Sequence, residues 1–141
     1  MDEVSLFIDM LSNGWSASAT ALVSAGTISA SHAVTPEFLD VRNTTKNKGV
    51  RVDLSRSPAT IVVFEDGQTI DYPTAMYDIR NETYTFTTHI RVLHDERGGT
   101  DAAYGKDRLR SIYLILRRVI ESKRTGYTAS DNSKFDQLFL G

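Results

Sequence analysis

The chain has 141 residues, no cysteine and a formal net charge of −2. These values exclude disulfide bonds, thiolate chemistry and cysteine-ligated zinc, and they exclude a general electrostatic attraction of the whole molecule to DNA. The length suits one domain, so we expect a single domain over 1–141. Residues 1–3 are acidic where a secretory signal is basic, and no apolar run approaches the ~20 residues that cross a bilayer. We therefore expect a soluble intracellular protein without a membrane partner.

Near the N-terminus, an apolar stripe at helical spacing predicts a short amphipathic helix. Its members are Val4, Phe7, Ile8 and Leu11. Asn13-Gly14 is a typical C-terminal stop for such a helix. The next tract, 15–34, is rich in Ala, Ser and Thr after Trp15. Two interpretations stay open: an extended arm that packs on a neighbouring subunit, with Trp15 as a contact, or a mobile loop.

Extended segments follow this tract. Residues 36–41 carry apolar side chains after a proline, and 50–54 alternate between apolar and charged residues, which suggests a short strand. Residues 61–64 are continuous and mainly β-branched, which is typical of a strand buried on both faces. Asp66-Gly67 is a tight-turn dipeptide, after which the chain is expected to turn back.

The clearest pattern is an alternating strand over 83–92. Its apolar positions are Tyr84, Phe86, Ile90 and Val92, with polar residues between them. This period of two predicts one face on a core and one face in water, as in an antiparallel sheet. Residues 95–99 break the strand, and Thr100 or Asp101 can cap the helix that follows.

That helix is predicted over 101–124. Its apolar stripe consists of Leu109, Ile112, Tyr113, Leu116, Val119 and Ile120. A sheet face and a helix face must bury each other. The expected fold class is therefore α+β, with a mixed or antiparallel sheet packed against one long helix and a short N-terminal helix.

Another side of the predicted helix is basic. Arg110, Arg117 and Arg124 are seven residues apart, and Arg118 lies nearby. Three interpretations stay open: a solvated face with local ion pairs, an interface with an acidic patch on a partner subunit, or a nucleic-acid contact. No aromatic residue is expected between the arginines, which argues against a surface for single-stranded nucleic acid.

Catalytic and metal-binding patterns are weak. His89 and His94 are five apart on the predicted strand, so their side chains should point to opposite faces, and Asp95 and Glu96 belong to the following turn. A hydrolase that uses His89 or His94 with Asp95 is the weakest hypothesis. We expect no enzymatic activity, no cofactor and no metal.

The order of elements resembles that of tail-completion and neck proteins of tailed viruses, including the lambda-type tail terminators. The resemblance rests on the N-terminal helix, the extended segment 36–42, the buried strand 59–65, the strand segment 87–92 and a last strand over 135–140, with the long helix between them. It implies a structural virion subunit that forms a homo-oligomeric ring, usually hexameric, at the head-tail junction.

The same resemblance implies the partners: other copies of the chain, the tail tube, and the connector or neck proteins. DNA would pass through the ring without specific binding, and the location would be the virion, with the host cytoplasm during assembly. The expected interface residues are Arg110, Arg117, Arg118, Arg124 and Trp15. The alternative function is a small nucleic-acid-binding or regulatory module that uses the basic side of helix 101–124.

Overall fold

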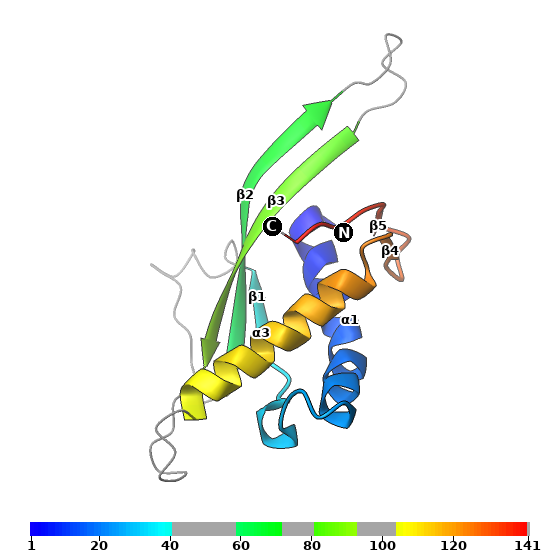
Figure 1. The fold of residues 1–141 in the computed structure, drawn as a ribbon. Helices are drawn as coiled ribbons and strands as arrows, with labels where there is room; N and C mark the ends of the chain where they lie inside the picture. The colour runs from blue at the N-terminus through cyan, green and yellow to red at the C-terminus, as the bar shows by residue number, and fades with distance from the viewer. Residues whose placement is uncertain (41–58, 72–80, 93–103, 141) are drawn as a thin grey trace.

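Two long helices pack over a small mixed sheet in the computed structural model, which describes residues 1–40, 59–71, 81–92 and 104–140 (Figure 1). The elements in chain order are α1 (Glu3–Ser24), the 3-10 helix η1 (Ala30–His32), β1 (Glu37–Asp40), β2 (Ala59–Asp71), β3 (Asn81–Val92), α3 (Tyr104–Ser122), β4 (Tyr127–Thr128) and β5 (Lys134–Phe135). The predicted strand at 50–54, the break at 95–99 and the predicted caps Thr100 and Asp101 lie outside the described residues.

Helix α1 is much longer than the sequence predicted. It begins at the N-cap Asp2, whose carboxylate accepts a hydrogen bond from the backbone N–H of Ser5 at 2.8 Å. It then runs for 22 residues through Asn13-Gly14 and ends before Gly26, which has a φ of +74°. The prediction of a short helix that stops at Gly14 was therefore wrong, and so was the extended arm over 15–34.

Gly14 has a packing role in place of the predicted capping role. A Cβ at Gly14 would lie 3.0 Å from Cγ1 of Val119, so α1 and α3 approach each other too closely there for a larger residue. The helix tolerates this glycine because its neighbours bury apolar side chains on both sides of it, among them Leu11 and Trp15.

Trp15 belongs to the core of the protomer. Its side chain is 1% exposed, its indole N–H donates to the Val34 carbonyl at 3.0 Å, and its ring meets that of Phe38 edge-on at 5.6 Å. These contacts hold the segment that follows α1 against the core of the same protomer. The expected role of Trp15 as an inter-subunit contact is thus not supported by its position.

The sheet has the order β1-β2-β3, with β1 parallel to β2 and β2 antiparallel to β3. A mixed sheet was one of the two expected forms. The prediction of a buried strand over 61–64 is confirmed for 61–63, which are fully buried, whereas Phe64 is half-buried. The predicted turn at Asp66-Gly67 was wrong. The pairing register shifts between Glu65 and Gly67, which marks a β-bulge, and β2 continues to Asp71.

The alternation predicted for the next strand is confirmed in β3 for three of its four apolar positions, whereas Tyr84 lies beyond the core. Phe86, Ile90 and Val92 pack against the core, and the ring of Phe86 stacks on that of Phe7 at 4.8 Å. This contact joins β3 to α1, so the sheet is covered by two helices and the expectation of one long helix was incomplete.

The long helix is confirmed, but its buried side is rotated relative to the prediction. The buried apolar residues of α3 are Ile112, Ile115, Leu116, Val119 and Ile120. Leu109 and Tyr113, which the predicted stripe included, are 39% and 43% exposed. Arg108 is instead buried, at 7% exposure. The predicted stripe was centred incorrectly because it omitted Ile115.

The predicted last strand over 135–140 was also wrong. Only Lys134 and Phe135 are paired, with β4, in a separate two-stranded sheet. This small hairpin is tied to α1, since the Tyr127 hydroxyl donates to the carboxylate of Asp9 and accepts from the Asn13 amide at 2.8 Å.

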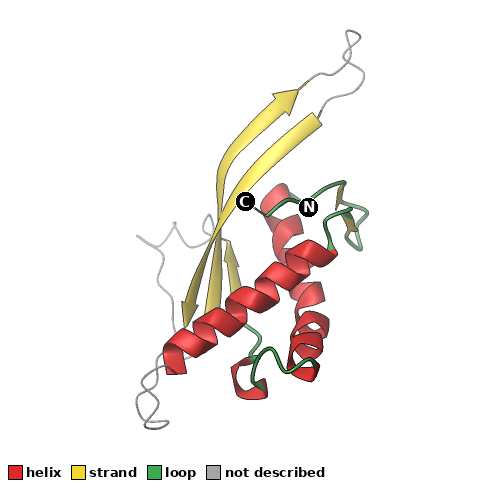
Figure 2. Cartoon of the chain, viewed as in Figure 1, coloured by secondary structure: helices red, strands yellow, loops and turns green. Residues whose placement is uncertain are grey.

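The β2–β3 hairpin extends well beyond the helices (Figure 2). We call the projecting part, Asp66–Asp71 with Asn81–Thr85, the outer hairpin. Residues 66–71 are all exposed, whereas the inner part of β2 is buried. The bulge therefore lies where the strand leaves the core.

Candidate interaction surfaces

The exposed side of α3 carries a line of cationic side chains. Lys106, Arg110 and Arg117 are spaced by four and seven residues, which places them on one side of an α-helix, and all three are exposed. We call these residues the basic helix face. Among the described residues, Lys106 and Arg110 have no carboxylate within ion-pair distance. Arg117 donates from Nε to Glu121 at 3.0 Å, and this hydrogen bond raises the pKa of Arg117.

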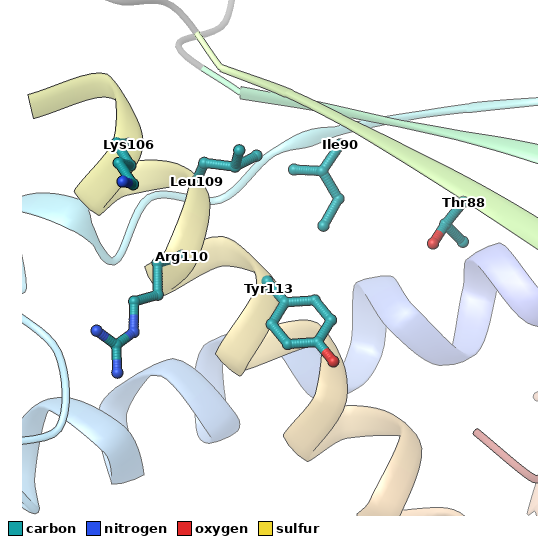
Figure 3. A pocket seen from close by; sticks show the side chains of 6 residues that line it. All are labelled: Thr88, Ile90, Lys106, Leu109, Arg110 and Tyr113. Carbon is teal, nitrogen blue, oxygen red and sulfur yellow. The ribbon is translucent and has the colours of Figure 1, made fainter. Parts of the chain in front are cut away.

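An open hollow of about 430 Å³ adjoins the basic helix face (Figure 3). It is lined by Thr88, Ile90, Lys106, Leu109, Arg110 and Tyr113. The two strand residues face α3 across the hollow, and the guanidinium of Arg110 is directed away from it. Leu109, Ile90 and Tyr113 supply an apolar floor beside two cations. Such a surface suits an apolar side chain that is flanked by carboxylates.

The outer hairpin has the opposite charge on one of its faces. The Tyr84 hydroxyl donates to Glu82 at 2.9 Å and accepts from Gln68 at 3.2 Å, so these three side chains share a face. The hydrogen bond to Glu82 raises the pKa of Tyr84, and the charges of Glu3 and Glu65 contribute in the same direction. We call Gln68, Ile70, Glu82 and Tyr84, together with the half-buried Glu65 at the inner end of the same side of the hairpin, the acidic hairpin face.

Ile70 is the apolar member of this face. It pairs directly with Glu82 across the two strands, and opposite residues in an antiparallel pair have neighbouring side chains. Its side chain is 44% exposed. The acidic hairpin face therefore presents one apolar residue beside the carboxylate of Glu82.

The structure brings together only part of the predicted interface. Arg110 and Arg117 share the basic helix face. Arg118 is also exposed, but it follows Arg110 by eight residues and lies about 80° further around the helix. Arg124 lies beyond the end of α3, where its carbonyl accepts from the Leu138 N–H at 3.1 Å. Trp15 is in the core, away from any exposed surface.

Sequence reasoning missed the position of Tyr113. This residue was placed in the buried stripe, and no aromatic residue was expected between the arginines. In the structure Tyr113 is exposed, three residues after Arg110 and four before Arg117 on the same side of α3. The spacing itself was the available signal, since residues three and four apart are neighbours on a helix surface.

The histidines form no chemical site in the described part of the chain. His89 is exposed, and its ring lies 4.6 Å from that of Phe64. His94, Asp95 and Glu96 lie outside the described residues. Within 1–40, 59–71, 81–92 and 104–140, no three His, Asp or Glu side chains are grouped closely enough to hold a metal ion. No helix in those ranges is long and apolar enough to span a bilayer.

No protein-family model matches this chain, and comparison with curated proteins and with solved structures likewise gave no match. The functional argument therefore rests on the surfaces described above.

Proposed function

We propose that this chain is a structural subunit that assembles with copies of itself into a ring in the tail or neck of a tailed virus, as a tail terminator or a neck subunit. The observation that carries the proposal is the projecting hairpin. A hairpin with exposed faces beyond the core contributes little to the stability of the protomer, but it offers a large surface to a neighbour.

The sheet edges support the same proposal. Strand β1 pairs with β2 only over Thr60–Val63. From Phe64 to Asp71, β2 has no partner other than β3 within the described residues, and β3 has no second neighbour there. Unpaired edges are templates for strands of another chain.

Ring formation is consistent with the distribution of surfaces. The basic helix face and the acidic hairpin face are different patches, so a contact between them is heterologous, and repeated heterologous contacts close into a ring when the rotation permits. The net charge of −2 is compatible with a lumen through which DNA passes without being held. The link to virion proteins rests on the resemblance seen in the sequence. The buried strand, β3 and the long helix of that resemblance are present, whereas the last strand over 135–140 is not.

Native mass spectrometry over a concentration series, with negative-stain imaging of the largest species, tests the proposal. We expect concentration-dependent assembly into closed rings, hexameric or close to it. A protein that stays monomeric at every concentration would contradict a self-assembling subunit.

One observation favours a second candidate, a nucleic-acid-binding module. Tyr113 lies between Arg110 and Arg117, and an aromatic ring flanked by cations can stack on a base while the cations contact phosphates. Fluorescence anisotropy with labelled single-stranded DNA distinguishes the two functions. The module predicts salt-sensitive binding that Tyr113→Ala weakens about tenfold, because base stacking on an aromatic residue contributes about 1–3 kcal/mol. The ring predicts little affinity at physiological salt.

A further inference from the structure

The exposed apolar side chains in the described part of the chain gather at two separate places. Large apolar side chains are exposed there at Met1, Ile70, Leu109, Tyr113, Phe139 and Leu140. Leu109 and Tyr113 belong to the hollow beside the basic helix face, whereas Phe139 and Leu140 follow each other after β5. Single exposed apolar residues are ordinary on a protein surface, but groups of them mark sites of interaction. Each of the two places is therefore a candidate contact surface.

Phe139 is the most exposed of these side chains, at 82%. The residue before it is anchored, because Leu138 packs against the core and its N–H donates to the Arg124 carbonyl at 3.1 Å. Phe139 thus leaves the core directly after a fixed point. An aromatic side chain that is already held in place loses less freedom on binding, so more of its buried area counts toward affinity.

The hollow can receive an aromatic ring. Its apolar lining is formed by Ile90, Leu109 and Tyr113, and two aromatic rings pack favourably in edge-on or offset arrangements. The hollow opens toward solvent between β3 and α3 (Figure 3). Phe139 of the same protomer does not occupy it, since the ring of Phe139 is exposed. A second copy of the chain carries the same exposed ring and can place it there.

Charge and spacing match between the two places. Asp136 is exposed and has no ion-pair partner in the described ranges, and Lys106 is an exposed cation of the hollow. Asp136 precedes Phe139 by three residues of chain without helix or strand, which span at most about 10 Å. Lys106 precedes Tyr113 by seven residues of α3, which also correspond to about 10 Å along the helix axis. A ring beside Tyr113 therefore allows the carboxylate to reach the lysine.

We propose that Phe139 of one copy docks in the hollow of the next copy, beside Tyr113. In this contact Asp136 pairs with Lys106. The inference rests on the proposed function, because it names a contact that would hold the ring together. The hollow and the segment 136–140 are different patches of one chain, so the contact is heterologous and repeats from copy to copy. The buried ring supplies most of the affinity, and the charge pair sets the direction of the segment along α3.

Phe139→Ser tests the apolar part of the contact. We expect this variant to need a protein concentration at least about tenfold higher than wild type to assemble, because the buried ring is lost. It should melt like wild type, since Phe139 is exposed in the protomer. Gln137→Ser is the matched control, because it changes another exposed residue of the same segment, and it should assemble as wild type does.

A charge exchange tests the direction of the segment. Asp136→Lys and Lys106→Glu should each weaken assembly a few-fold, because each places like charges together. A chain that carries both changes restores the pair with its signs reversed, so it should assemble better than either single variant. A double variant that assembles no better than the single ones would overturn the pairing of Asp136 with Lys106.

Photochemical crosslinking locates the ring directly. With p-benzoylphenylalanine in place of Phe139, irradiation of the assembled protein should yield a product of twice the chain mass on a denaturing gel. Mass spectrometry of its peptides should place the attachment in the hollow, on β3 between Thr88 and Ile90 or on α3 between Leu109 and Tyr113. A product of single chain mass with the same attachment would show that the occupant is the chain's own segment, which overturns the contact between copies.

The outcomes separate this contact from the ring itself. If wild type forms rings and Phe139→Ser forms them at the same concentrations, the contact is overturned while the ring stands. If crosslinks between copies form only outside the hollow, the contact is again overturned and the ring is not. If wild type never assembles, both proposals fail.

Discussion

Gly14 of α1 and Val119 of α3 lie so close together that a Cβ on the glycine would be 3.0 Å from a valine methyl carbon. Val119 is fully buried, so it has little room to move aside. This pair limits how deeply α1 and α3 pack against each other, and hence where the sheet and the hollow lie relative to α3.

Replacing the glycine tests this relationship. We expect Gly14→Leu to lower the free energy of unfolding by about 2 kcal/mol, because overpacking a core outweighs the better helix propensity of leucine. Urea denaturation, followed by circular dichroism, measures the change. Ala17→Leu is the matched control, since it also introduces a leucine in α1 but at an exposed position, and it should leave stability almost unchanged.

A second variant pair separates overpacking from helix propensity. In a Val119→Ala background the clash is relieved, so Gly14→Ala should then raise stability by about 1 kcal/mol through helix propensity alone. A Gly14→Leu protein as stable as wild type would show that the helices can separate there at no cost.

The rotation of α3 gives a second prediction. Ile112→Asp should abolish folding at ordinary temperature, because the side chain is fully buried and a charge there would have no partner. Leu109→Asp should change stability by less than about 1 kcal/mol, since Leu109 is partly exposed. Thermal melts of the two proteins decide this. Equal losses in both would mean that the stripe predicted from the sequence, which contained both residues, is the buried one.

The fluorescence of Trp15, the single tryptophan, tests the segment 15–34, which was predicted from the sequence to be an extended arm. Because Trp15 is buried in the monomer, its emission should be blue-shifted and poorly quenched by iodide even at concentrations too low for assembly. Unfolding in urea should shift the emission to the red. Red-shifted emission that iodide quenches readily in the monomer would instead support the hypothesis of an extended arm over 15–34.

Alkaline pH should destabilise the junction between α1 and the C-terminal hairpin. Burial and the hydrogen bond to Asp9 raise the pKa of Tyr127 above its ordinary value of 10.0. The folded state therefore holds this proton more tightly than the unfolded state does. That contribution is fully present below pH 10 and is lost as the pH rises through the folded-state pKa.

Melting temperatures measured from pH 8 upwards test this linkage. Tyr127→Phe should lose less stability at alkaline pH than wild type does. Asp9→Asn should also lose less, because it removes the negatively charged acceptor of the Tyr127 hydrogen bond. Tyr113→Phe, an exposed tyrosine on α3, is the control and should follow the wild-type curve. Parallel curves for wild type and Tyr127→Phe would show that this hydroxyl does not couple folding to pH.

Much of the fold could be predicted from periodicity alone. The alternation from Thr83 to Val92 identified β3, and the β-branched run before Phe64 identified the buried part of β2. Two of the failures came from the interpretation of glycines. Gly14 and Gly67 both have the local sequence of a stop or turn, because Asn-Gly and Asp-Gly are typical of such sites. In the structure, Gly14 instead allows α1 to lie close to Val119 of α3, and Gly67 adjoins a β-bulge. Both roles depend on contacts with distant parts of the chain, so the neighbouring residues do not reveal them.

The candidate surfaces were predicted only in part, for a related reason. Arg110 and Arg117 follow from helical spacing. The acidic hairpin face could not be found, because a turn at Asp66-Gly67 would have separated Gln68 and Ile70 from their partners Tyr84 and Glu82. The exposure of Tyr113 depends on how α3 is rotated against α1, and the contact at Gly14 constrains that rotation.

The bulge at Glu65–Gly67 divides one strand into two parts with different constraints. Residues 59–63 before it are buried, so a change there alters the stability of the whole protomer. Residues 66–71 after it are exposed, so we expect changes in the length or charge of this segment to cost the fold little. Selection for a new neighbour could therefore act on the outer hairpin alone, so that one body can serve related assemblies whose subunits differ mainly in that projection.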